Sequence, residues 1–202
     1  MFDATAPITL KLPAPDAPDG QKRVTVRFPS DEEWTERQRA RKIITKSFGR
    51  GMSKSDVPGH AEVDEAFVRR IKTAGPEVDC YEAISIVNAL SQCDVTDVER
   101  DGTAYTVRMR VPGGDVSVGL RMPSAREIHA FRREYISSYD LPYGKSSTSV
   151  NLEAAARLFD ALNVGEAVGY TGPVPIIHKE AALVAMIAEF ESGLGVSDDN
   201  LF

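Results

Sequence analysis

The sequence contains little cysteine and no long hydrophobic run. Cys80 and Cys93 are the only cysteines among 202 residues, which is too few for a disulfide framework, and their spacing fits no zinc motif. No stretch approaches the roughly 18 consecutive apolar residues of a membrane span. The first 20 residues lack the basic start and apolar stretch of a secretory signal. We therefore expect a reducing, cytoplasmic location.

Motifs that carry chemistry are also absent. Gly144-Lys145-Ser146 resembles the end of a P-loop, but the position that needs glycine is Tyr139. Gly49-Arg50-Gly51 lacks the third glycine of a dinucleotide site and follows a predicted helix. His60-Ala61-Glu62 has no Pro-Cys-x-x-Cys partner of a zinc deaminase. The sequence thus predicts no catalytic, cofactor-binding or metal-binding residue and favours a protein that is not an enzyme.

Charge is unevenly distributed along the chain. The net charge is −6, and the segment 146–202 holds two basic and eight acidic residues. By contrast, a basic stretch without any acidic residue contains Arg37, Arg39, Arg41, Lys42, Lys46, Arg50 and Lys54. Two interpretations remain open: the bases balance the dipole of a helix that begins with acidic residues, or they bind phosphate or an acidic protein surface. In the second case these residues, together with Trp34, form a partner-binding surface.

One local pattern occurs twice. VTVRFPSDEEW at 24–34 and VSVGLRMPSAREI at 116–128 each read as a strand ending in Arg-x-Pro-Ser, followed by a helix. In both copies Ser and the Glu three residues later form a capping box, Ser30/Glu33 and Ser124/Glu127. Aligned on the proline, the copies share an arginine before it, the serine and the glutamate. They arise either from an internal duplication or from convergence on a good helix start.

Hydrophobic periodicity completes the prediction of secondary structure. We expect strands at 8–12, 24–28, 95–99, 105–111 and 116–120, with loops at 53–59 and 139–150. We expect helices from 30 to about 48, from about 63 to 74, around 81–90, from 124 to about 135, around 152–162 and around 183–192. This predicts an α+β fold of two antiparallel hairpin-plus-helix units with additional helices and an all-helical C-terminal region. The expected division is 1–55, 56–145 and 146–202, or a single domain.

The doubled Arg-x-Pro-Ser phrase resembles the signature of certain bacteriophage tail assembly chaperones, in which a short hairpin ends in a similar phrase and a helix follows. The resemblance implies a non-enzymatic phage or prophage protein without a cofactor. It would bind other tail proteins (tape measure, tail tube) or itself, in the host cytoplasm or in the virion. The alternatives are a structural component of a phage particle or injection system (tail, neck or baseplate), and a nucleic-acid-binding accessory protein that uses the basic stretch 37–54.

Overall fold

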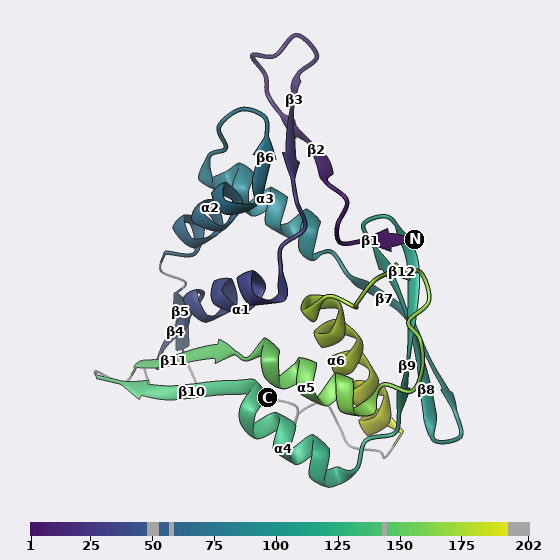
Figure 1. Cartoon of the computed structure of the whole chain (residues 1–202). Helices are drawn as coiled ribbons and strands as arrows, with labels where there is room; N and C mark the ends of the chain where they lie inside the picture. The colour runs from purple at the N-terminus through teal and green to yellow at the C-terminus, as the bar shows by residue number, and fades with distance from the viewer. Residues whose placement is uncertain (48–52, 57–58, 143–144, 194–202) are drawn as a thin grey trace. The chain divides into compact units, whose positions relative to one another are not determined.

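The computed structural model describes residues 1–47, 53–56, 59–142 and 145–193 (Figure 1). The chain forms two compact units. The N-terminal unit comprises Ala4–Ser91 and Ile136–Asn151, and the C-terminal unit comprises Met1–Asp3, Gln92–Tyr135 and the described residues from Leu152 onward. These units do not coincide with the expected boundaries at 55 and 145, because one hairpin of the second half, 136–151, packs within the N-terminal unit.

The N-terminal unit combines a small sheet with three helices. Strands β2 (Ile8–Pro13), β3 (Gln21–Val26) and β6 (Lys72–Ala74) pair antiparallel in the order β2-β3-β6. Helices α1 (Asp31–Ala40), α2 (His60–Ile71) and α3 (Cys80–Ser91) follow. The apolar residues of the alternating strand β3 and of one face of each helix form the core, which includes Val24, Val26, Trp34, Phe67, Ile71, Ile86 and Leu90.

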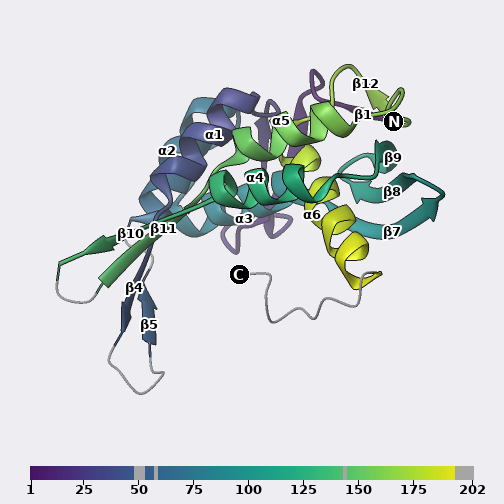
Figure 2. The ribbon, with the colours of Figure 1, turned by 90° about the horizontal axis from the view of Figure 1, so that it is seen from below.

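A second sheet in this unit joins two hairpins from distant parts of the sequence. Strands β4 (Ile43–Ser47) and β5 (Ser53–Asp56) form one hairpin, and β10 (Ile136–Leu141) and β11 (Lys145–Val150) form the other. The strand order is β10-β11-β4-β5, because β11 pairs antiparallel with β4 from Lys145↔Lys46 to Thr148↔Ile43. Figure 2 shows the β4–β5 hairpin extending away from α1 and α2.

The C-terminal unit packs its helices around a three-stranded antiparallel sheet. Its order is β7 (Asp94–Asp101), β8 (Ala104–Val111), β9 (Gly114–Arg121). Helices α4 (Ala125–Tyr135), α5 (Leu152–Leu162) and α6 (Ile176–Ser192) complete the unit, and α6 contacts β7 and β8. A short parallel pair joins β1 (Phe2–Asp3) to β12 (Tyr170–Thr171). The core includes Tyr105, Val107, Met109, Leu120, Phe159, Leu162, Leu183 and Met186.

The α+β fold class and most of the expected elements are confirmed. Four predictions are wrong. The first helix ends at Ala40 instead of about Phe48, since the β-branched run Ile43-Ile44-Thr45 forms β4. The second helix ends at Ile71 instead of 74, since Lys72–Ala74 pairs with β3 as β6. The expected loops at 53–59 and 139–150 contain β5, β10 and β11, whose polar sequences gave no signal for a half-buried strand. The C-terminal region is not wholly helical, because it includes β12 and most of β11.

The two halves of the chain have the same order of elements. The first repeat, Ile8–Ser91, runs hairpin (β2–β3), α1, hairpin (β4–β5), α2, β6, α3. The second repeat, Ala104–Ser192, runs hairpin (β8–β9), α4, hairpin (β10–β11), α5, β12, α6. Strand β7 precedes the second repeat as an addition, and β12 takes the place of β6 in the order while pairing with β1.

Backbone contacts confirm that the repeats are equivalent. Helix α2 ends at Ile71 and α5 at Leu162, and both of these side chains are buried. In each repeat, the residue that follows this helix pairs with the residue that precedes the shared arginine. The pairs are Lys72 with Val26 in the first repeat and Asn163 with Leu120 in the second. These contacts align Ile71 with Leu162 and Arg27 with Arg121. An internal duplication therefore accounts for the doubled motif better than convergence on a helix cap, which would not reproduce a tertiary contact.

Candidate binding surfaces

The shared arginine of each repeat binds the glutamate of its own capping box. The Arg27 guanidinium donates to both carboxylate oxygens of Glu33, at 2.7 and 2.5 Å. Arg121 donates to Glu127 in the same way, at 3.2 and 2.6 Å. A bidentate ion pair of this kind fixes the position of the strand end relative to the helix start. The Arg-x-Pro-Ser-x-x-Glu pattern is therefore a structural clamp that orients the first helix of each repeat.

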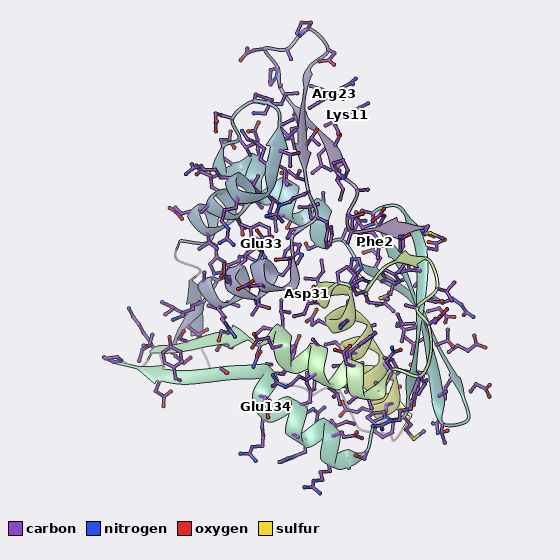
Figure 3. The ribbon with its side chains drawn as sticks, viewed as in Figure 1. Phe2, Lys11, Arg23, Asp31, Glu33 and Glu134 are labelled. Carbon is purple, nitrogen blue, oxygen red and sulfur yellow. The ribbon has the colours of Figure 1, made fainter. Side chains whose placement is uncertain are left out.

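The cap completes the clamp and changes its electrostatics. The Ser30 amide donates to Glu33 at 2.9 Å, and the Glu33 amide donates to the Ser30 hydroxyl at 3.2 Å. Ser124 and Glu127 make the same two contacts at 2.8 and 3.3 Å. Hydrogen bonds from the arginine and then from the serine stabilise the charged carboxylate, and they lower the pKa of Glu33 and of Glu127 to about 2. Figure 3 shows Glu33 at the start of α1.

Two of the residues expected on a partner surface are core residues. Trp34 is 1 % exposed and packs against Phe28 and Phe67. Arg37 is 8 % exposed and donates from Nε to Asp64 at 2.7 Å, with its guanidinium 5.6 Å from the ring centres of Trp34 and Phe67. The prediction of a partner surface is wrong for these two, because α1 turns its tryptophan and the first of the bases toward α2.

The other bases of the stretch have different positions. Arg41 lies at the end of α1 with Nε 3.7 Å from the same Asp64 carboxylate. Lys42 is exposed and its Nζ lies 5.9 Å from the centre of the Tyr139 ring. Arg39 is an exposed residue of α1. Lys46 lies in β4 and Lys54 in β5, but their side chains and all of Arg50 are outside the described residues. The structure thus brings Arg37 and Arg41 together around one carboxylate and separates Lys46 and Lys54 from the helix.

A groove lies between the first two helices of each repeat. The groove between α1 and α2, the α1/α2 groove, has a volume of about 290 Å³. Its lining consists of Glu33, Glu36, Arg37, Ala40, Val63, Ala66, Phe67 and Arg70. The groove between α4 and α5, the α4/α5 groove, has a volume of about 220 Å³. Its lining consists of Glu127, Ala130, Phe131, Glu134, Ala154, Arg157, Leu158 and Ala161. Every lining position of one groove is equivalent to a lining position of the other in the alignment above.

Each groove has one end bridged by an ion pair and one end bordered by alanines. In the α1/α2 groove Arg70 donates to Glu36 at 2.9 Å from both terminal nitrogens. The equivalent positions of the α4/α5 groove are Ala130 and Ala161. In the α4/α5 groove, Arg157 donates to Glu134 at 2.5 Å. The positions equivalent to these two residues in the α1/α2 groove are Ala66 and Ala40. The repeats therefore present similar grooves that are open at opposite ends.

Buried titratable side chains gather at the base of α6 in the C-terminal unit. Tyr135 donates a hydrogen bond to Glu180, and burial raises the pKa of both groups. The Oη atom of Tyr170 lies 3.2 Å from Nδ1 of His178, a fully buried residue, and burial lowers the pKa of His178 to about 4. Burial and the nearby Glu180 raise the pKa of Cys93 to about 12. Burial thus favours the neutral form of each of these groups, which suits structural roles inside the unit.

No metal centre emerges from the described part of the chain. Among the residues at 1–47, 53–56, 59–142 and 145–193, no three His, Cys, Asp or Glu side chains are close enough to hold a metal ion. None of the helices in these ranges is both long enough and apolar enough to cross a membrane. Searches with protein-family models, among curated proteins and among solved structures found no match.

Sequence reasoning did not find the two grooves. The sequence predicts loops, or a continuation of helix α1, where the structure has the strands between the helices of each pair. It therefore does not reveal that the α1/α2 and α4/α5 pairs are equivalent. A signal was nevertheless present in the alignment on the shared proline. It places Ala40 opposite Glu134 and Glu36 opposite Ala130, an exchange of a small residue for a charged one at two neighbouring positions.

Proposed function

We propose that this protein is a non-enzymatic phage or prophage tail assembly chaperone that binds other tail proteins through its two helix-pair grooves. The observation that carries the proposal is the repetition of a groove with the same lining positions in both repeats. The resemblance of the Arg-x-Pro-Ser phrase to that of tail assembly chaperones supplies the class of partner. The proposed location is the cytoplasm of the infected cell.

The size of the grooves supports a protein partner. Pockets for small-molecule ligands usually enclose about 300–1,000 Å³; the α1/α2 groove lies at the lower limit of that range and the α4/α5 groove below it. They have room for a few side chains of a partner instead of a whole substrate. Alanines at the open end of each groove allow close approach, while Phe67 and Leu158 supply apolar contact at equivalent positions. An amphipathic helix that inserts apolar residues at helical spacing meets these requirements.

The tape-measure protein is the proposed partner, since long helical segments with apolar stripes would otherwise associate before the tail tube forms. Two grooves on one chain would bind two such stripes of the same partner. Simultaneous binding raises the overall affinity, because the second contact becomes intramolecular once the first has formed. The net charge of −6 favours solubility of the resulting complex.

The ion pairs that bridge the grooves provide a matched test. The double variant Ala130→Glu/Ala161→Arg copies the Glu36–Arg70 pair into the α4/α5 groove, and Ala40→Glu/Ala66→Arg copies the Glu134–Arg157 pair into the α1/α2 groove. Each transfers a pair that the other repeat already accommodates. The full-length chain would be co-expressed with the tape-measure and tail-tube proteins encoded in the same genome, and affinity would be measured on the purified complex.

We expect each double variant to weaken tape-measure binding at least tenfold and the combined variant to abolish it. Glu36→Ala/Arg70→Ala, which opens the bridged end, serves as the control and should retain binding. Circular dichroism must show unchanged helix content in every variant. Full affinity in the combined variant would overturn the groove proposal, and a genome without a tape-measure gene near this one would remove the tail-specific part.

A structural role in the particle is the alternative. A chaperone is absent from finished particles, whereas a tail, neck or baseplate component is present at a fixed copy number, and mass spectrometry of purified particles separates the two. The geometry weakens the nucleic-acid alternative at Arg37 and Arg41, which are directed toward Asp64, whereas Arg39 and Lys42 are exposed.

A further inference from the structure

The four-stranded sheet of the N-terminal unit ends in two open edges. Its order is β10-β11-β4-β5. Within the described part of the chain, the outer edge of β10 and the outer edge of β5 have no strand beside them. Open edges expose a row of backbone donors and acceptors that can pair with another strand. The kind of strand that fits each edge follows from the way the sheet is already joined.

The sheet is built from two equivalent hairpins arranged head to tail. Strands β4 and β10 follow the first helix of their repeats, and β5 and β11 lead into the second helix. We call β4 and β10 the outgoing strands of their hairpins, and β5 and β11 the return strands. In the order β10-β11-β4-β5, outgoing and return strands therefore alternate. The central contact joins the return strand β11 of one hairpin to the outgoing strand β4 of the other. A two-fold arrangement would instead have joined two strands of the same kind.

The two open edges belong to one strand of each kind. The strand β10 is an outgoing strand without a return partner on its outer side, and β5 is a return strand without an outgoing partner. We propose that copies of this chain associate head to tail, with β5 of one copy pairing antiparallel with β10 of the next. The contact repeats between chains what β11 and β4 already form within one chain.

The internal contact also gives the register. The hairpin pairings Ile44↔Asp56 and Ser138↔Thr148 align β4 with β10 and β5 with β11. The pair Ser147↔Ile44 within the sheet then corresponds to Ser55 of one copy opposite Ser138 of the next. Similarly, Thr148↔Ile43 corresponds to Asp56 opposite Ser137. The equivalence of the hairpins thus selects one pairing from the many that two free edges would permit.

Head-to-tail contacts of this kind do not close on themselves in a dimer. Each added copy leaves one β10 edge and one β5 edge open, so the association yields rings or filaments. The contact is short, with four residue pairs in its internal counterpart, and short strand pairs are weak in isolation. We therefore expect an assembly that depends on protein concentration. This inference is independent of the groove proposal, because none of the groove residues lies in the four strands.

Crosslinking in the predicted register tests the proposal. In a full-length chain carrying Cys80→Ser and Cys93→Ala, the single variants Ser55→Cys and Ser138→Cys are prepared and treated with a short bis-maleimide at several protein concentrations. We expect covalent dimers when the two single variants are mixed and a ladder of larger species from the double variant Ser55→Cys/Ser138→Cys. Each single variant alone should remain monomeric on denaturing gels.

Two controls keep the experiment decisive. The variant Ile43→Cys/Thr148→Cys joins the internal contact at a pair that is not buried and should crosslink within one chain, which shows that the sheet is formed and the reagent reaches it. Crosslinked dimers from Ser138→Cys alone would indicate a two-fold contact and overturn the proposal. Failure of the mixed variants to crosslink while the internal control succeeds would overturn it as well, whatever the outcome of the tape-measure binding assay.

Discussion

Arg37 and Asp64 form a buried ion pair between α1 and α2, and the second repeat fills the same two positions with Phe131 and Ala155. The Nε atom of Arg37 lies 2.7 Å from the Asp64 carboxylate, and the two side chains are 7 % and 2 % exposed. The equivalent Phe131 and Ala155 are buried apolar residues. One scaffold thus supports either a charged or an apolar pair at this helix contact.

This difference between the repeats predicts that substitutions of Arg37 and Asp64 have strongly non-additive effects on the free energy of unfolding. Asp64→Ala leaves the Arg37 charge buried and should destabilise the N-terminal unit by about 3–5 kcal/mol, the usual cost of removing one partner of a buried pair. Arg37→Leu/Asp64→Ala removes both charges and should recover more than half of that loss. Leucine replaces phenylalanine here because Trp34 and Phe67 are larger than their counterparts Ile128 and Leu158.

Urea unfolding followed by tryptophan fluorescence measures the effect. Trp34 is the single tryptophan of the chain and lies in the core of this unit, so the signal reports on the unit that carries the variants. The prediction fails if the double variant is no more stable than Asp64→Ala. Conversion of Phe131 to leucine serves as the matched control in the other repeat and should leave the fluorescence transition unchanged.

The arginine clamp predicts a pH-dependent contribution at the start of α1. Glutamine retains the capping-box geometry at this position, so Glu33→Gln keeps an acceptor for the Ser30 amide but removes the charge and one of the two oxygens that accept from Arg27. At pH 7 we expect a loss of up to about 1 kcal/mol, since Arg27 is substantially exposed. Ser30→Ala, which removes the cap itself, should cost about 1 kcal/mol.

The two clamp variants should differ in their response to acid. The folded-state pKa of Glu33 is about 2, below its ordinary value of 4.5, so its stabilisation is complete above pH 4.5 and is lost as the pH falls toward 2. The difference between wild type and Glu33→Gln in urea unfolding should therefore shrink over that range. A difference that stays constant from pH 7 to pH 2.5 would show that the carboxylate charge has no part in the clamp.

His178 predicts a separate acid sensitivity in the C-terminal unit. Burial lowers its pKa to about 4 from 6.5, so the folded state binds fewer protons than the unfolded state between these values. The contribution of the neutral His178 to the free energy of unfolding is fully present above pH 6.5. It should fall by up to about 3 kcal/mol as the pH decreases to 4. His178→Gln, which cannot titrate, should show a much smaller fall over the same interval.

Hydrogen exchange of the α6 amides, detected by mass spectrometry, is a suitable readout for this unit. Glu180 acts in the opposite direction because burial raises its pKa, so the informative quantity is the difference between wild type and variant at each pH. His129, which is exposed on α4, provides the control. The exchange of His129→Gln should equal that of the wild type at each pH. Equal pH profiles for wild type and His178→Gln would contradict the assignment.

Local sequence was sufficient for the capped starts of α1 and α4, the β2–β3 and β8–β9 hairpins and most of the core. Ser30/Glu33 and Ser124/Glu127 form the expected boxes, because a cap needs only residues three positions apart. Leu152, Ala155, Phe159 and Leu162 are all buried, because a helix converts their spacing directly into one face. The spacing of Tyr81, Val87 and Leu90 predicts one buried face for α3, but Tyr81 is exposed and Ala83 is buried instead.

Contacts between segments that are distant in the sequence determined the features that local sequence did not predict. The sequences of β5, β10 and β11 are mostly polar, and they are strands because backbone pairing with one another and with β4 satisfies their donors and acceptors. Trp34 and Arg37 are buried because α2 supplies Phe67 and Asp64 opposite them. The grooves and the open strand edges also arise from such pairings. Periodicity along one segment contains no information about which other segment will cover it.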